Sequence, residues 1–200
     1  MIAAVVLAAG FSTRMGRPKL ILPWGSTTII GQVIATLVRA GLDEVVVVTG
    51  ASRAEVEAAV REGHWEAVWT VFNPRYPLDD MLISLQVGMA ALGNKVEAAL
   101  VALGDQPFIE VEIVRALLEA YRAGGKPLIV PSYHLHRGHP WIVDRSLWLD
   151  LLSATLGTTM RDFLHAHAQQ TTYIPVESPS ILRDVDTPED YARSTILYDV

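Results

Sequence analysis

Short apolar runs alternate with segments of helical periodicity along most of this chain, and this alternation constrains the fold more than any other feature. Continuous apolar runs bounded by glycine or polar residues are typical of parallel strands that helices cover on both faces. Such runs cover residues 2–7, 44–49, 65–72 and 98–103. Helix-periodic stretches follow them at residues 28–40, 52–61, 81–92 and 110–123. The pattern predicts βαβ units around a mainly parallel sheet.

Local signals mark several element boundaries. Gly41 follows the first helical stretch, and glycine commonly ends a helix because it adopts the left-handed conformation. Ser52 precedes the second stretch with Glu55 three positions later, and this pair predicts a capping box. Asn73 and Pro74 end the third strand.

The last part of the chain is less regular. Strand candidates lie at residues 128–130, 141–143 and 171–175 with short helices between them, so we expect some antiparallel pairing. A chain of 200 residues, half of them hydrophobic, can bury one full α/β core. No repeat or linker marks a boundary. We therefore expect a single domain over residues 1–200, an α/β Rossmann-like three-layer sandwich with a mainly parallel, mixed sheet.

Composition excludes several classes of function. A formal net charge of −6 without runs of Lys or Arg argues against a nucleic-acid partner. The chain has no cysteine, which excludes disulfides, thiolate metal sites and a cysteine nucleophile. No basic stretch precedes the first apolar run, and the longest apolar stretches are far below the ~20 residues that cross a bilayer. We expect no membrane contact and a cytoplasmic location.

A glycine-rich loop follows the first strand over residues 7–19 and carries features of a phosphate-binding loop. Gly10 and Gly16 permit close approach of backbone amides to an anion, and Arg14 and Lys19 supply positive charge. The loop lacks both the Gly-Lys-Ser/Thr ending of a P-loop and the G-x-G-x-x-G spacing of dinucleotide-binding loops. Together these features favour a triphosphate ligand, and an ordinary loop with two solvated cations is the alternative.

A carboxylate stands at the end of another predicted strand, in Gly104-Asp105-Gln106-Pro107. In open α/β sheets the carboxyl ends of strands face the ligand crevice, so Asp105 is a candidate Mg²⁺ ligand beside a triphosphate. Its alternative role is turn formation before Pro107. Asp186 or Thr187, just before Pro188, is suited to capping a helix, a structural role that needs no ligand.

Two further elements carry polar side chains. Asn73 and Ser84 offer an amide and a hydroxyl suited to reading the edge of a base. Arg137 and His139 lie in a loop shaped by Gly138 and Pro140, where a basic group could meet a phosphate; a surface or packing role is the alternative for the histidine.

These motifs resemble, in order, those of the nucleotidyltransferases related to the MobA and MocA proteins. Residues 7–19 match every fixed position of the motif L-A-A-G-x-S-x-R-M-G-x-x-K, and residues 104–107 match G-D-x-P. Residues 137–140 resemble R-G-H-P, residues 184–190 resemble D-I-D-T-P-E-D, and residues 73–85 resemble N-P…G-M-x-x-S-L. The resemblance covers nearly the whole chain and is closest to the molybdenum cofactor cytidylyltransferases.

The resemblance implies a fold of the nucleotide-diphospho-sugar transferase type and transfer of CMP from CTP to the phosphate of molybdenum–molybdopterin, with release of pyrophosphate. It implies Mg²⁺ as cofactor, a molybdopterin-type acceptor, and a molybdenum hydroxylase apo-enzyme as candidate partner. The implied catalytic residues are Arg14, Lys19 and Asp105, with Asp105 and Asp186 as metal ligands and Asp184 as a weaker candidate. The implied binding residues are Leu7, Ala8, Ala9, Gly10, Arg14, Lys19, Asn73 and Ser84 for the nucleotide, and Arg137 and His139 for the acceptor.

Three alternatives remain open, and a departure from the family pattern supports one of them. Asp79-Asp80 stands where the family usually has Gly before the methionine, which puts two negative charges beside an anionic ligand. A sugar- or alditol-phosphate nucleotidyltransferase therefore remains an alternative. A guanylyltransferase is another, although that group usually opens with Leu-x-Gly-Gly where this chain has Leu7-Ala8-Ala9-Gly10. The third is a non-catalytic carrier that inserts molybdenum cofactor into an enzyme.

Overall fold

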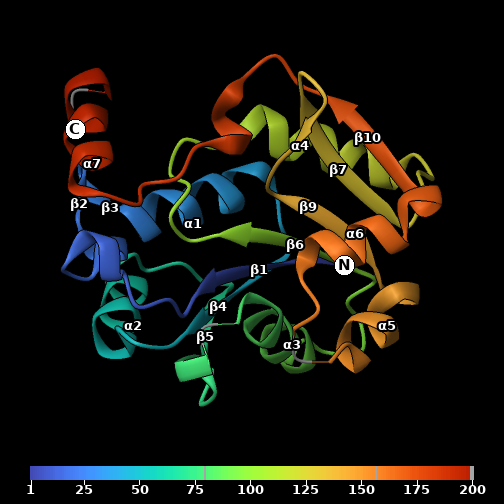
Figure 1. The fold of residues 1–200 in the computed structure, drawn as a ribbon, viewed down its shortest axis with the longest axis horizontal. Helices are drawn as coiled ribbons and strands as arrows, with labels where there is room; N and C mark the ends of the chain where they lie inside the picture. Colours follow the sequence, from blue (N-terminus) through green and yellow to red (C-terminus); the bar gives the residue numbers. More distant parts are fainter. Residues whose placement is uncertain (79, 156, 199–200) are drawn as a thin grey trace.

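A mixed sheet forms the middle layer of the molecule (Figure 1). The structure is a computed structural model that describes residues 1–78, 80–155 and 157–198. The strand order of the sheet is β10-β7-β9-β6-β1-β4-β5, and β8 pairs with β7. The strands are β1 (Ile2–Ala8), β4 (Glu44–Thr49), β5 (Val68–Phe72), β6 (Ala98–Leu103), β7 (Leu128–Tyr133), β8 (His136–Arg137), β9 (Trp141–Asp144) and β10 (Thr171–Pro175). A two-stranded hairpin, β2 (Pro23–Trp24) and β3 (Thr27–Thr28), lies apart from it.

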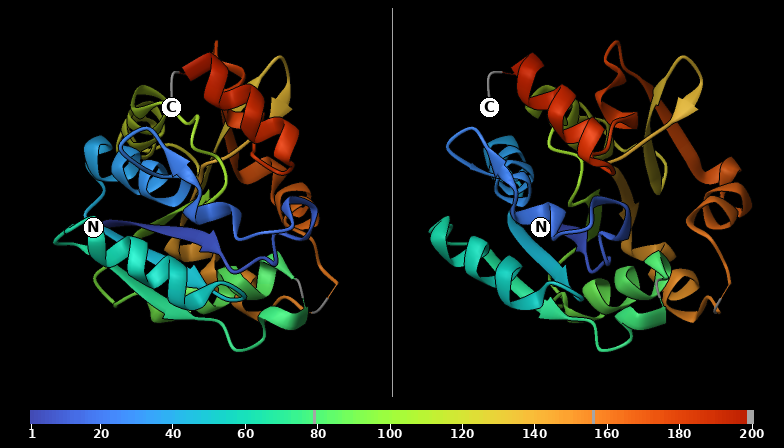
Figure 2. Two further views of the ribbon diagram at one scale, coloured as in Figure 1. Left: turned by 90° about the vertical axis from the view of Figure 1, so that its left-hand side faces the viewer. Right: turned by 60° about the vertical axis from the view of Figure 1, so that its left-hand side comes forward.

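Helices cover both faces of the sheet, as expected for a three-layer α/β sandwich (Figure 2). One core contains side chains of α1 (Ile29–Ala40), α2 (Arg53–Glu62) and α4 (Val111–Arg122); the other contains side chains of α3 (Met81–Ala91), α5 (Trp148–Ser153) and α6 (Met160–Ala166). β1 contributes alternate residues to the two cores, with Ala4 and Val6 in the first and Ala3 and Val5 in the second. This alternation explains why the strand is apolar throughout.

The pairing of the strands confirms the expected mainly parallel, mixed sheet. β1 pairs in parallel with β4 and β6, and β4 with β5. β9 is antiparallel to both of its neighbours, β6 and β7, whereas β10 is parallel to β7. The antiparallel pairing expected in the later part of the chain is therefore centred on β9.

Two boundary predictions are wrong. The third strand begins at Val68 and not at Trp65, because Trp65 folds back and its ring fills the space beside Gly63 at the end of α2. The capping box at Ser52 is also absent. Ser52 has φ −107° and ψ 45°, outside the extended region of a side-chain cap, and its hydroxyl makes no cap hydrogen bond. By contrast, Thr28 caps α1 by accepting from the Gly31 amide at 3.1 Å.

The parallel register brings two loops to one edge of the sheet. Leu7 of β1 is aligned with Leu103 of β6, so the loop after β1 and the turn at residues 104–107 start side by side. The Gly104 amide donates to the Leu7 carbonyl at 2.9 Å and holds them together. Across the described residues, no helix combines the length and apolar character needed to span a bilayer.

Candidate nucleotide-binding site

The loop after β1 is closed on itself by local hydrogen bonds. The Met15 and Gly16 amides donate to the Ser12 carbonyl at 3.1 and 3.2 Å, and the Lys19 amide donates to Ser12 Oγ at 3.2 Å. Gly16 has φ 69°, a left-handed conformation that favours glycine. A Cβ on Gly10 would meet no atom within 4 Å, so space beside its backbone is left for a ligand.

The loop after β4 supports this loop from one side. The Ala51 amide donates to the Ala9 carbonyl at 3.2 Å. Gly50 packs so closely on Ala9 that an added Cβ would overlap the Ala9 carbonyl. The position of Ala9 is therefore fixed by a close backbone approach that requires glycine at position 50.

Four charged side chains form a continuous network beside the loop. Lys19 Nζ lies 2.6 Å from Asp105 Oδ2 and 2.5 Å from Asp186 Oδ1. Arg14 Nη1 lies 2.5 Å from Asp186 Oδ2. Burial alone would lower the pKa of Lys19, but the two carboxylates outweigh it and hold that pKa above its usual value. Residues far apart in sequence thus meet at the carboxyl edge of the sheet.

The segment before α7 (Pro188–Tyr198) delivers the second carboxylate of this network. The Val185 amide donates to the Asp105 carbonyl at 2.9 Å, which places Asp184 and Asp186 on either side of that contact. Burial and the negative charges of Asp186 and Asp105 raise the pKa of Asp184. The site therefore concentrates negative charge that one ammonium and one guanidinium offset.

The carboxylates fit a divalent cation that takes its remaining ligands from elsewhere. Asp105 and Asp186 both lie within 2.6 Å of Lys19 Nζ, so one ammonium group already binds both carboxylates. Asp105 Oδ1 is buried and has no hydrogen-bond partner in the described structure. Among the described residues no group of three acidic or histidine side chains is arranged to hold a metal. Mg²⁺ prefers such a site, with one or two carboxylates and the rest from phosphate and water.

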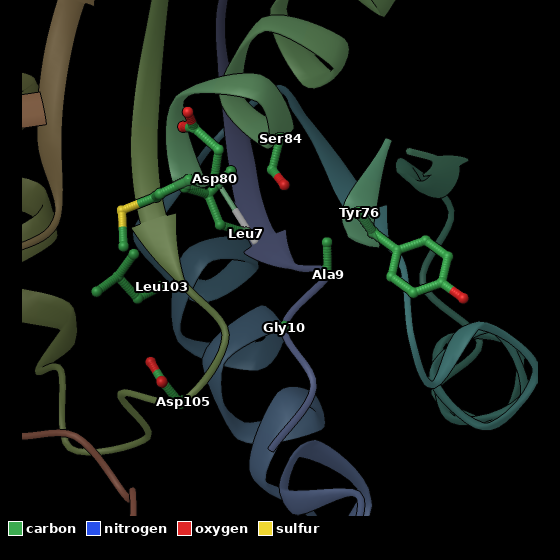
Figure 3. A pocket seen from close by; sticks show the side chains of 9 residues that line it. Leu7, Ala9, Gly10, Tyr76, Asp80, Ser84, Leu103 and Asp105 are labelled. Atoms are coloured by element: carbon green, nitrogen blue, oxygen red, sulfur yellow. The ribbon is translucent and has the colours of Figure 1, made fainter. Parts of the chain in front are cut away.

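A pocket opens between the loop and the start of α3 (Figure 3). We call it the phosphate-loop pocket. Figure 3 shows Leu7, Ala9 and Gly10 from the loop side, with Ser84 and Asp105 at its opposite ends. Four lining residues were not among the predicted site residues: Tyr76, Asp80, Met81 and Leu103. Ala8, which was predicted, has its side chain in the core, so only its backbone is available to a ligand.

Arg137 and His139 lie in a separate groove. They line it together with Trp141 of β9 and residues of α6. The Nε2 atom of His139 is buried without a hydrogen-bond partner in the described structure, and burial lowers the pKa of this histidine to about 4. The ring is therefore neutral near pH 7, and positive charge on this side comes from arginine.

Comparison with known proteins identifies the family. Residues 4–171 match the model of the MobA-like NTP transferase domain. The chain belongs to this family. Molybdenum cofactor cytidylyltransferase of Escherichia coli K12 is 26% identical over 197 residues, covering 98% of this chain and 97% of that protein. Nicotine blue oxidoreductase of Paenarthrobacter nicotinovorans is 33% identical over 200 residues, covering 96% and 95%.

A solved structure of similar sequence supports the same placement. Rv0371c of Mycobacterium tuberculosis H37Rv has a TM-score of 0.83 and 27% identity, with 100% of this chain and 98% of that chain covered. The same protein has also been crystallised in complex with manganese, at a TM-score of 0.77 with 96% of each chain covered. The chain is thus a MobA-like nucleotidyltransferase of the α/β fold.

Two predicted features of this MobA-like domain take unexpected positions. Asn73 is completely buried; its Nδ2 donates to Ser84 Oγ at 3.1 Å and its Oδ1 accepts from the Arg75 amide at 2.9 Å. Asn73 does not line the pocket, whereas Ser84, the residue to which it donates, does. No sequence signal distinguishes these two roles.

Asp80 is the N-cap of α3 in this MobA-like domain. Its Oδ1 accepts from the Leu82 amide at 2.8 Å and the Ile83 amide at 3.4 Å. An acidic residue that departs from the family pattern therefore has a structural role at the helix start. Asp79, the other half of that departure, lies outside the described residues.

Proposed function

We propose that this protein is a Mg²⁺-dependent cytidylyltransferase that moves CMP from CTP to the phosphate of a molybdopterin-type acceptor and releases pyrophosphate. The observation that carries the proposal is Lys19 held between Asp186 and Asp105, the second of which lines the phosphate-loop pocket. The ammonium of Lys19 lies where we expect the metal and the triphosphate to bind. The reaction is proposed to occur in the cytoplasm and to serve a molybdenum hydroxylase apo-enzyme.

Positioning and charge neutralisation account for the chemistry, so no protein nucleophile is needed. Ala9 and Gly10 line the pocket, and the backbone amides of Ala8 to Gly10 are the proposed donors to the nucleotide phosphates. Arg14 and Lys19 exchange their aspartate partners for phosphate oxygens. An oxygen of the acceptor phosphate forms the new bond to the α-phosphorus, and the bond to the β-phosphate breaks with its electron pair leaving on pyrophosphate.

Asp105 and Asp186 are the proposed metal ligands. Bound there, Mg²⁺ would polarise the α-phosphate and neutralise the pyrophosphate. The unpartnered Asp105 Oδ1 supports this assignment. The manganese complex of the M. tuberculosis relative supports a divalent cation as cofactor, without indicating its ligands. Arg14, Lys19 and Asp105 together are the proposed catalytic residues.

CTP is the proposed nucleotide because the glycine-rich loop begins with Leu7-Ala8-Ala9-Gly10 and because the chain is similar to a cytidylyltransferase over nearly its whole length. Ser84, oriented by Asn73, is the proposed contact to the base or ribose. A guanylyltransferase and a sugar- or alditol-phosphate nucleotidyltransferase remain the alternatives within the same fold. A carrier that inserts the cofactor without catalysis is the alternative outside enzymes.

A redox reaction is a second candidate function. The specific observation that favours it is the 33% identity, over 96% of the chain, to a protein named as an oxidoreductase. The two candidates differ in their products, because nucleotidyl transfer releases pyrophosphate and a redox reaction does not.

The decisive experiment measures pyrophosphate release with Mg²⁺, molybdenum–molybdopterin and each of CTP, GTP, ATP and UTP. We expect release with CTP and none from a folded Asp105→Ala variant. Thermal shift with each nucleotide reports binding independently, since a ligand that binds the native state raises stability by RT ln(1 + [L]/Kd). Release with GTP alone would identify a guanylyltransferase. Stoichiometric binding without release would identify a carrier, and neither binding nor release with any of the four nucleotides would favour the redox candidate.

A further inference from the structure

The groove that contains Arg137 and His139 is bounded by two elements that the sequence did not connect. One wall is β8 and the residues that follow it, and the other is α6. Trp141 of β9 stacks on Phe163 of α6, with ring centroids 6.4 Å apart and planes 27° apart, and fixes the helix against the sheet. Figure 1 shows α6 beside β9. We call this cavity the arginine groove.

The helix α6 presents a second arginine to this groove. Met160, Arg161 and Leu164 all line it. Their spacing of i, i+1 and i+4 places them on one side of the helix. Thr159 and Asp162 form a capping box that fixes the start of the helix and therefore the direction of this side. Arg137 and Arg161 thus enter the same groove from opposite walls.

The charge of the groove contrasts with that of the whole protein. The chain has a formal net charge of −6, yet no acidic residue is among those that line the groove. Neither Arg137 nor Arg161 forms an ion pair with a carboxylate anywhere in the described part of the chain. Hydrogen bonds from Thr159 and, to a smaller extent, the charge of Arg161 lower the pKa of Asp162, but no ion pair among the described residues holds either guanidinium, and both are exposed. Both are therefore suited to binding phosphate through paired N–H donors.

Most of the remaining lining is apolar, apart from the exposed His136 and two buried polar atoms. The apolar lining consists of Leu135, Met160, Leu164 and Leu182, and Leu135 is 96% exposed. His139 Nε2 and Trp141 Nε1 are buried and have no hydrogen-bond partner within the described residues. Buried polar atoms normally have partners, and an enclosed water behind the lining would supply one to these two. At about 580 Å³ the groove matches the size of small-molecule sites.

The same chain segment connects the groove to the aspartates. The His139 amide donates to the Ile181 carbonyl at 3.0 Å, and four residues later the Val185 amide donates to the Asp105 carbonyl at 2.9 Å. Gly138 packs on Ile181 so tightly that a Cβ would overlap its carbonyl. Residues 181–185 therefore link the wall of the groove that contains His139 to the strand end that contains Asp105.

The family resemblance already implies that the acceptor, a phosphate monoester on a flat ring system, meets Arg137 and His139. We propose that Arg161 is a further binding residue for this acceptor and that it holds the phosphate together with Arg137. This inference rests on the proposed nucleotidyl transfer for its role, but not for its test. The apolar residues contact the ring, and the two arginines hold the phosphate that attacks the α-phosphorus of the nucleotide.

Flavin mononucleotide is a suitable equilibrium probe because it combines a flat ring system with one phosphate monoester, and riboflavin lacks only the phosphate. Fluorescence titration should show that the wild-type protein binds flavin mononucleotide at least about tenfold more tightly than riboflavin. Arg161→Ala should weaken flavin mononucleotide binding by about 10- to 100-fold and leave riboflavin binding unchanged, with Arg161→Lys intermediate. Arg122→Ala, at an exposed arginine of α4, is the control.

Three results would overturn the inference: no saturable binding of flavin mononucleotide, equal affinity for the two flavins, or equal affinity of Arg161→Ala and wild type for flavin mononucleotide. In turnover, Arg161→Ala should raise the KM for the acceptor and leave the KM for CTP unchanged. Loss of pyrophosphate release from the wild-type protein would refute the proposed function and leave the titration informative. Normal kinetics of Arg161→Ala would refute the role of Arg161 and leave the function intact.

Discussion

The phosphate-loop pocket and the arginine groove hold their positive charges in opposite ways. Arg14 and Lys19 each lie within 2.6 Å of an aspartate, whereas Arg137 and Arg161 form no ion pair with a carboxylate within the described residues. A ligand of the first site must therefore separate existing ion pairs, and a ligand of the groove need not. The contrast suggests that the nucleotide and metal bind by exchange of partners, and the acceptor binds to cations that are already available.

The largest expected effect comes from removing Lys19, the cation that the two aspartates share. Lys19→Met should lower turnover by about 100- to 1,000-fold, because a donor that stabilises developing phosphate charge is lost. Without nucleotide, the same change should raise Mn²⁺ affinity about tenfold, because the ammonium no longer competes for Asp105 and Asp186. Pyrophosphate assays and Mn²⁺ titration by electron paramagnetic resonance would measure the two effects.

Lys95→Met, at an exposed lysine, is the matched control and should change neither quantity. If Lys19→Met left Mn²⁺ affinity unchanged or lowered it, the ion pairs would not compete with the metal, and the two sites would not differ as described.

On the groove side, the pH dependence of stability tests whether the ring of His139 is kept neutral. Burial lowers the pKa of His139 to about 4 from an ordinary value of 6.5, so below pH 6.5 the unfolded chain binds a proton that the folded protein does not. Stability from this residue is complete above pH 6.5 and is lost as the pH falls toward 4, by about 3 kcal/mol in total. Urea unfolding at several pH values would measure this loss.

His139→Gln should remove this part of the pH dependence, since glutamine does not titrate. His165→Gln, at an exposed histidine of α6, should leave it in place. An unchanged pH profile in His139→Gln would show that the groove does not keep this ring neutral.

One tightly packed glycine lies beside each site, so a substitution at either glycine should affect only its own site. An added Cβ at Gly50 would overlap the Ala9 carbonyl, and one at Gly138 would overlap the Ile181 carbonyl. Each change to alanine should cost about 1–3 kcal/mol of stability, because the backbone must shift to relieve the overlap. Gly50→Ala should raise the KM for CTP, and Gly138→Ala the KM for the acceptor.

Gly93→Ala, where an added Cβ meets no atom within 4 Å, is the control. Steady-state kinetics with each substrate varied would test the separation. A rise in the same KM from both substitutions would mean that the two regions are not independent.

The smallest expected effect concerns Asp80. Asp80→Asn should keep the cap on α3, because asparagine caps as well as aspartate, and should tighten CTP binding about two- to fivefold by removing a negative charge from the pocket. Asp80→Ala should tighten binding similarly but lose about 1 kcal/mol of stability with the cap. Isothermal titration and urea unfolding would separate the two, and weaker CTP binding by Asp80→Asn would assign the carboxylate to ligand binding.

The sequence predicts the phosphate-loop side better than the groove side, for a physical reason. The parallel strands have continuous apolar runs, and parallel pairing brings their carboxyl ends to one edge, so the loop and Asp105 could be placed together in advance. The capping box at Ser52 failed because capping depends on backbone angles that tertiary packing sets. Likewise, the amide of Asn73 could not be assigned inward or outward.

Arg161 illustrates what local patterns omit. Its helix is short, and the side that it presents is set by the stacking of Phe163 on Trp141 across the core. Sequence periodicity reports which side of a helix is apolar, but not which distant strand that side meets. The two arginines are 24 positions apart along the chain, and only the tertiary fold brings them to one groove.

The segment with anchors at Ile181 and Val185 sets a constraint on chain length. Its two backbone contacts, to His139 and to Asp105, are separated by a fixed number of peptide units. Inserting or deleting one residue between them would release one anchor and rotate Asp186 away from Lys19. The family match ends at residue 171, before this segment. A truncated protein that stops there would lose most of β10 and a charge partner of Lys19, so the proposed site extends beyond the residues that the family model matches.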